Sequence, residues 1–163
     1  MSVHAVLYSL LSRHRIVLLK ENDGDRYLPI WIGSNEAEAI AMRLQGGTVP
    51  RPLTHDLLAN MISELGGEVQ HIVVNDLRNN TFYARIAIEQ ENRLNLVDSR
   101  PSDAIALAVR TEVPIYAEEG VMEKAGIVPS PDVREEMEGM TGEDLDVFRD
   151  FVDGLDLDDL EEE

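Results

Sequence analysis

The chain begins with short apolar runs rich in β-branched residues. The runs VHAVLYSLL, RIVLLKEN and RYLPIWIG are typical of strands, and NDGD between the second and third indicates a hairpin turn. We therefore expect three strands to open the fold.

Two stretches after these runs have the spacing of amphipathic helices. Ser34 is the expected cap of the first and Thr54 of the second, and glycine pairs at 46–47 and 66–67 are the expected stops. Apolar residues recur at helical spacing at Ala37, Ile40, Ala41 and Leu44, and again at Leu57, Leu58, Met61, Ile62 and Leu65. The pattern predicts one buried face on the first helix and one apolar stripe on the second.

The middle of the chain alternates between apolar and polar residues. EVQHIVVNDL and TFYARIAIEQ flank an Asn-Asn turn, which indicates a hairpin, and RLNLVDSR supplies a further strand. A third helix is expected from about Pro101 to Arg110, with proline near its first position, and VPIYAEE is expected to form a short last strand. This order predicts an α+β fold, in which a mixed, mostly antiparallel β-sheet packs with helices in a single domain.

The charge is concentrated at the carboxyl end. The net charge is −18, and residues 132–163 hold 15 acidic and 2 basic residues. We place a domain at 1–130 and an acidic linker, weak helix and tail at 131–163, with Leu145, Phe148 and Val152 on the helix. Such a tail is expected to be a solubilising segment, or alternatively a phosphate mimic that covers a basic site.

Composition narrows the chemistry. The chain has no cysteine, which excludes disulfides, thiolate metal sites and cysteine nucleophiles. Neither a membrane-length apolar run nor a signal peptide is found, so we expect a cytoplasmic protein without a membrane partner.

Two helix starts carry the same residue types. Arg51 and Thr54 precede or begin the second helix, and Arg100 and Ser102 do the same for the third. Unpaired N–H groups and the helix dipole favour an anion at such a start, and arginine adds a planar fork suited to phosphate. We therefore predict that these four residues bind substrate phosphate. The alternative is ordinary capping by the hydroxyls and surface ion pairing by the arginines.

Titratable groups lie next to these residues. His55 can act as a general base or a metal ligand, and Asp56 and Asp103 are the other catalytic candidates. A packing role for His55 is the alternative. Oxygen ligands suit Mg²⁺ or Mn²⁺, and the candidate ligands are Glu36, Asp56, Asp103 and also Asp98. The common nucleotide-binding and hydrolase motifs are absent from the sequence.

Four blocks of the sequence resemble the bifunctional nuclease domain family of bacteria, archaea and plants. They are YLPIWIGSNEAEAIAMRLQG, PRPLTHDLL, LGGEVQHIVVNDLRNNTFYARI and SRPSDAIALAVRTEVPIYAEE. The resemblance covers roughly residues 3 to 127 and implies a compact α+β domain that forms homo-oligomers. It also implies cleavage of RNA and DNA, an activity reported for some members. A carboxyl-terminal motif like that of excision-repair proteins, which some relatives have, is not found here.

Two functional classes remain open at this stage. The protein is either a nuclease that hydrolyses phosphodiester bonds, or a non-catalytic module that binds an anion, a nucleotide or a protein partner. The small number of lysines and the net acidic character favour the second, because nucleases that bind without sequence preference usually have a basic stripe.

Overall fold

The computed structural model describes residues 1–8 and 15–130. The expected acidic helix and tail at 131–163 lie outside these residues. No helix in the described part of the chain is long and apolar enough to cross a membrane.

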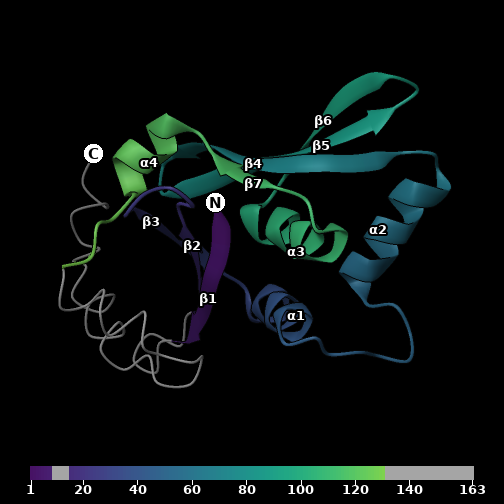
Figure 1. The fold of residues 1–163 in the computed structure, drawn as a ribbon, viewed down its shortest axis with the longest axis horizontal. Helices are drawn as coiled ribbons and strands as arrows, with labels where there is room; N and C mark the ends of the chain where they lie inside the picture. The colour runs from purple at the N-terminus through teal and green to yellow at the C-terminus, as the bar shows by residue number, and fades with distance from the viewer. Residues whose placement is uncertain (9–14, 131–163) are drawn as a thin grey trace.

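The fold has two sheets, and both are built mainly from hairpins (Figure 1). The first sheet has the order β1-β2-β3, with antiparallel pairing throughout. Its strands are β1 (Ser2–Tyr8), β2 (Arg15–Lys20) and β3 (Tyr27–Ile32). The three opening strands and the hairpin between the second and third are therefore confirmed.

The second sheet has the order β6-β5-β4-β7. Its strands are β4 (Glu68–Arg78), β5 (Thr81–Gln90), β6 (Arg93–Ser99) and β7 (Ile115–Ala117). The β4–β5 hairpin turns at Asn79 and Asn80, both with positive φ, as the Asn-Asn pair predicted. Among the described strands, β7 pairs with β4 in parallel and all the other pairs are antiparallel. The sheets are therefore mostly antiparallel, and the α+β class is confirmed.

Four helices complete the described fold, namely α1 (Ser34–Leu44), α2 (Thr54–Glu64), α3 (Pro101–Thr111) and α4 (Glu119–Ala125). The expected stops of α1 and α2 are confirmed. Gly46 and Gly66 have φ values of +69° and +76°, a region that glycine enters without a Cβ clash. The short helix α4 is not predicted by the sequence pattern.

The expected caps shift by one residue. Gly33 and Leu53 occupy the cap positions of α1 and α2, so Ser34 and Thr54 are already helical, and neither cap makes a side-chain hydrogen bond. At α2 the carboxylate of Asp56 accepts the Leu53 N–H instead, at 2.8 Å. The helix is therefore capped from its third residue.

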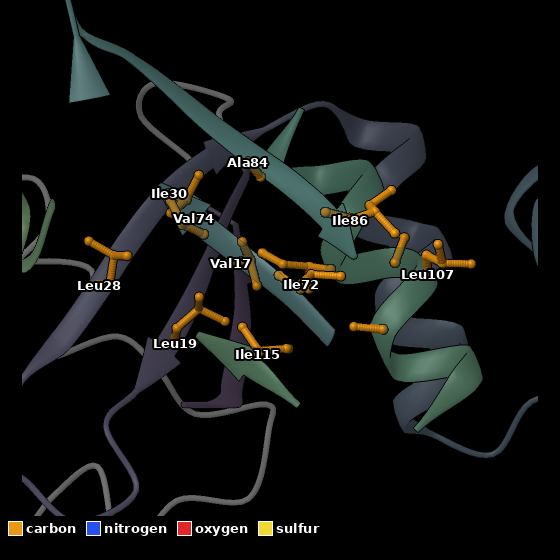
Figure 2. Close-up of a cluster of buried hydrophobic side chains, with 14 of the residues drawn as sticks. Val17, Leu19, Leu28, Ile30, Ile72, Val74, Ala84, Ile86, Leu107 and Ile115 are labelled. Carbon is orange, nitrogen blue, oxygen red and sulfur yellow. The ribbon is translucent and has the colours of Figure 1, made fainter. Parts of the chain in front are cut away.

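The main core lies between the two sheets and α3. Figure 2 shows side chains of β2 and β3 facing those of β4 and β5, with Leu107 of α3 on one side. The buried members include Val17, Leu19, Leu28, Ile30, Ile72, Val74, Ala84, Ile86 and Ile115. Residues 104–108 of α3 are all buried, so this helix is the central one, and α1 and α2 pack against it (Figure 1).

The two flanking helices differ in what they bury. Ala37 and Ile40 of α1 are buried, as predicted. In α2 only His55 is buried, while Leu57 and Met61 are each 53% exposed and Leu65 is 70% exposed. Its inner face is formed by His55 with the partly buried Ala59 and Ile62. Most of the predicted stripe of α2 therefore does not face the core.

We predict that α3 stabilises the fold mainly through its buried side chains. Leu107→Ala should lower the free energy of unfolding by about 2 to 5 kcal/mol, because Leu107 is fully buried and truncation leaves a cavity. Leu94→Ala, at a side chain 56% exposed on β6, is the matched control and should change it by about 0.5 kcal/mol or less. Urea unfolding measures both, and equal losses would contradict this view of the core.

Candidate functional site

The starts of α1, α2 and α3 meet through charged side chains. Glu36 lies in the first turn of α1, His55 and Asp56 in that of α2, and Asp103 in that of α3. Arg100 occupies the cap position of α3. The structure therefore brings together five of the residues that the sequence selected, from three separate segments.

Arg100 joins two of these carboxylates. Its Nε donates to Asp103 Oδ2 and its Nη2 to Glu36 Oε1, both at 2.8 Å. The Arg100 side chain is 66% exposed, so the guanidinium also faces solvent. Gly33 leaves room for Glu36, because a Cβ at that position would overlap the Glu36 carboxylate.

His55 is held on the other side of Asp103. Its Nε2 lies 2.9 Å from Asp103 Oδ1, and the residue is buried on the inner face of α2. Asp103 therefore bridges the imidazole and the Arg100 guanidinium. This is the arrangement by which a carboxylate orients a histidine for proton transfer.

Asp56 has a different partner, which the sequence analysis did not select. Arg110, in the last turn of α3, donates from Nε to Asp56 Oδ1 at 2.6 Å. It also donates to the carbonyls of Ala106 at 2.8 Å and Ala39 at 3.2 Å, so its guanidinium contacts α1, α2 and α3. The sequence does hold a signal for it. Arg110 follows Asp103 by seven residues, which puts both on one side of an otherwise apolar helix.

These contacts set the charge states of the two aspartates. Burial alone would raise the pKa of Asp103, but hydrogen bonds and charge from Arg100 and His55 outweigh it, and its pKa lies below the ordinary 3.8. Burial likewise opposes ionisation of Asp56, yet the Leu53 N–H and Arg110 lower its pKa below 3.8. Asp103 and Glu36 in turn raise the pKa of Arg100. Near neutral pH Asp56, Asp103 and Arg100 are therefore ionised.

The remaining candidates stand apart from it. Arg51 and Thr54 are exposed before and at the start of α2, Ser102 is buried in the first turn of α3, and Asp98 is exposed on β6. None of these side chains has a hydrogen bond or ion pair within the described residues. Among residues 1–8 and 15–130 no group of three or more His, Asp or Glu is positioned to hold a metal ion. Arg100 pairs with the carboxylates of Glu36 and Asp103, and Arg110 pairs with that of Asp56.

The ionised network predicts acid sensitivity. Because the folded pKa values of Asp56 and Asp103 lie below 3.8, their contribution to stability is complete above the unfolded value and is lost as pH falls through the folded values. The melting temperature should therefore fall steeply below about pH 4.

A variant separates this effect from general acid unfolding. The Asp56→Asn variant should have a lower melting temperature than the wild type at neutral pH, because the substitution weakens the pairing of buried Arg110. Its melting temperature should then fall less than that of the wild type on acidification. Melting curves of both proteins from about pH 6 to about pH 3 are the measurement. Parallel curves would contradict a role for Asp56.

Comparison with known proteins places the chain in a family. The sequence model of the bifunctional nuclease domain matches residues 17–130. An uncharacterized protein of Mycobacterium tuberculosis is 42% identical over 146 residues, which cover 89% of this chain and 87% of that protein.

Plant relatives match over a smaller part of their length. Bifunctional nuclease 1 of Oryza sativa is 27% identical over 117 residues, 70% of this chain and 35% of the rice protein. Bifunctional nuclease 1 of Arabidopsis thaliana is 26% identical over 106 residues, 63% of this chain and 33% of that protein. The domain match includes all three helices that carry the charged network, and the chain belongs to the bifunctional nuclease domain family.

Proposed function

We propose that this protein is a nuclease that hydrolyses phosphodiester bonds of RNA or DNA, with His55 as its general base. The observation that carries the proposal is the His55–Asp103 pair beside the exposed guanidinium of Arg100. Family membership supports the same activity, since several plant relatives are named bifunctional nucleases.

His55 has the chemistry for this role. If Nε2 carries the proton that Asp103 accepts, Nδ1 is the basic nitrogen and can take a proton from water or from a hydroxyl nucleophile. The lowered pKa of Asp103 keeps it ionised, so it stabilises the imidazolium that forms. We propose that Asp56 is a positioning residue for His55. It is the next residue in the chain, and its bond to Arg110 holds the first turn of α2 in place.

The substrate phosphate is proposed to bind at the two helix starts. The Arg100 guanidinium uses Nε and Nη2 on carboxylates, which leaves Nη1 for a phosphate oxygen. Arg51 has no internal partner among the described residues, and its whole guanidinium is available. Thr54 and Ser102 add hydroxyls in the same first turns.

A divalent cation such as Mg²⁺ or Mn²⁺ is the cofactor we propose, with Glu36, Asp56 and Asp103 as its ligands. These carboxylates have the right chemistry, but each now pairs with an arginine. A cation would have to displace Arg100 or Arg110 from them. We therefore assign the proton transfer to His55 and no catalytic step to the cation.

One observation favours a second candidate function. Every carboxylate of the site is neutralised internally, as expected of a network that holds helices together. A non-catalytic module that binds an anion, a nucleotide or a protein segment at the exposed arginines would need no more than this. Such a module would bind nucleic acid without cleaving it.

We predict that His55→Gln lowers cleavage of a labelled single strand at least about 100-fold, because general base catalysis typically contributes that much or more. His71→Gln is the matched control, since His71 lies on β4 against Tyr116. Each protein is assayed after identical purification, with added Mg²⁺ or Mn²⁺ and with a chelator. Cleavage that persists equally in both variants would indicate a contaminating nuclease and support the binding module.

Binding provides a separate prediction. Arg51→Ala and Arg100→Ala should each weaken single-strand binding by about 1.5 to 3 kcal/mol, the contribution expected of a hydrogen bond to a charged group. Arg93→Ala, on exposed β6, is the control and should change binding little. Arg51→Ala is the cleaner variant because it breaks no internal ion pair among the described residues. Unchanged affinity in both, measured by calorimetry, would remove the phosphate site.

A further inference from the structure

The first sheet is buried on both of its faces. One face, which includes Val17 and Leu19, belongs to the main core (Figure 2). The opposite face, which we call the outer face, carries a second apolar cluster made of Leu7, Ile16, Leu18 and Tyr27. The exposed fractions of Leu18 and Tyr27 are both 0%. The outer face is therefore covered as completely as the core face.

No element in the described part of the chain forms a layer over this outer face. The other apolar side chains that pack on the cluster are Ala5 and Trp31 of the same sheet, and Ile127 at its edge. The helices that contact the sheet, α1 and α4, contribute to the main core instead. Leu18 lies on the middle strand, and a side chain there is buried only when a second layer packs on it. The cover is therefore expected from residues outside the described ranges.

The loop between β1 and β2 is too short to cover all of this face. It joins Tyr8 to Arg15 through residues 9–14, and a loop of that length reaches outward by at most about 12 Å. Tyr27 pairs with Lys20, which is about 17 Å from Arg15 along β2. The segment over Tyr27 must therefore come from another part of the chain.

The carboxyl-terminal segment starts at the edge of the outer face. The Ile127 N–H donates to the Tyr27 carbonyl and the Tyr27 N–H to the Ile127 carbonyl, both at 2.8 Å. The Ile127 side chain packs on the outer cluster, and the described chain ends soon after it, at Ser130. The residues that follow are therefore tethered beside the outer face, which gives them a high effective concentration there.

Charge also favours this segment as the cover. The strands β1, β2 and β3 contain His4, Arg15 and Lys20 but neither aspartate nor glutamate. Lys20 Nζ lies 5.6 Å and the His4 ring 5.3 Å from the centre of the Tyr27 ring. The Tyr27 hydroxyl is buried and has no hydrogen-bond partner among the described residues. A segment rich in carboxylates supplies acceptors for an ammonium and a hydroxyl, and residues 132–163 hold 15 acidic residues.

We propose that the expected tail helix packs on the outer face of the first sheet of its own chain, with an apolar side formed by Leu145, Phe148 and Val152. The linker that precedes this helix is long enough, because three strands are only about 10 Å wide. The tail carboxylates then lie beside Lys20. This assignment does not depend on nuclease activity, and it places the tail on the sheet instead of over the arginines of the candidate site.

The first test uses Trp31, the only tryptophan, which lies on the outer face. In the full chain, Leu145→Asp and Phe148→Asp should shift the Trp31 emission to longer wavelength. They should also at least roughly double its quenching by acrylamide, because water then reaches the ring. Val147→Asp is the matched control, since it lies about 100° around the helix from Phe148, and it should change neither property.

Three results of this measurement would overturn the proposal. Unchanged emission in both Leu145→Asp and Phe148→Asp would mean that the tail does not cover the sheet. A change in Leu11→Asp and in neither tail variant would assign the cover to the β1–β2 loop. An equal change in Val147→Asp would mean that the tail does not use the proposed apolar side.

The second test is carbodiimide coupling, which joins a lysine amine to a carboxylate in contact with it. The chain has only two lysines, Lys20 and Lys124, so the coupled peptides can be assigned by mass spectrometry. We expect Lys20 to couple to carboxylates of residues 143–163. Phe148→Asp should lose most of this product and Val147→Asp should keep it.

A mixture of isotope-labelled and unlabelled protein shows which chain provides the tail. We expect the Lys20 product to join peptides of the same isotope composition, because the segment covers the sheet of its own chain. Products that join only labelled to unlabelled peptides would mean that the tail of another copy occupies the face. The absence of any product between Lys20 and the tail would also contradict the proposal.

Discussion

The positions of the three helices depend on one buried guanidinium. The Arg110 side chain is only 7% exposed, and a charge taken from water must find partners within the protein. It finds them on each helix, with the Asp56 carboxylate on α2 and the carbonyls of Ala39 on α1 and Ala106 on α3. Any relative movement of these helices would leave part of that charge unpaired. The first turns that carry the candidate site are fixed as a consequence.

This constraint limits the chemistry open to the site. The carboxylates that a metal would need are the same ones that neutralise Arg100 and Arg110. Their ion pairs join the helices to one another. The proposed nuclease would then rely on the second ring nitrogen of His55 and the outward part of Arg100. A proton acceptor beside a cation suits attack on a phosphodiester, because one group activates the nucleophile and the other stabilises charge on phosphate.

Features set by neighbouring residues could be predicted from the sequence. The Asn79–Asn80 turn, the glycine stops at Gly46 and Gly66 and the proline at the start of α3 depend on backbone preferences within a few residues. Only part of the candidate site could be predicted from the sequence. His55, Asp103 and Arg100 follow from residue types at helix starts, whereas Arg110 binds Asp56 across 54 positions, and no local pattern specifies that pairing.

The apolar stripe of α2, with Leu57, Met61 and Leu65 exposed, shows what a helical pattern leaves open about the face of a helix. Helical spacing of leucines indicates that one side of a helix will be covered, but it does not indicate which chain provides the cover. In this protein the side toward the core carries the buried His55 and the partly buried Asp56 and Ala59, and the larger apolar residues face outward. This inversion is what a helix requires if its inner face must hold polar chemistry.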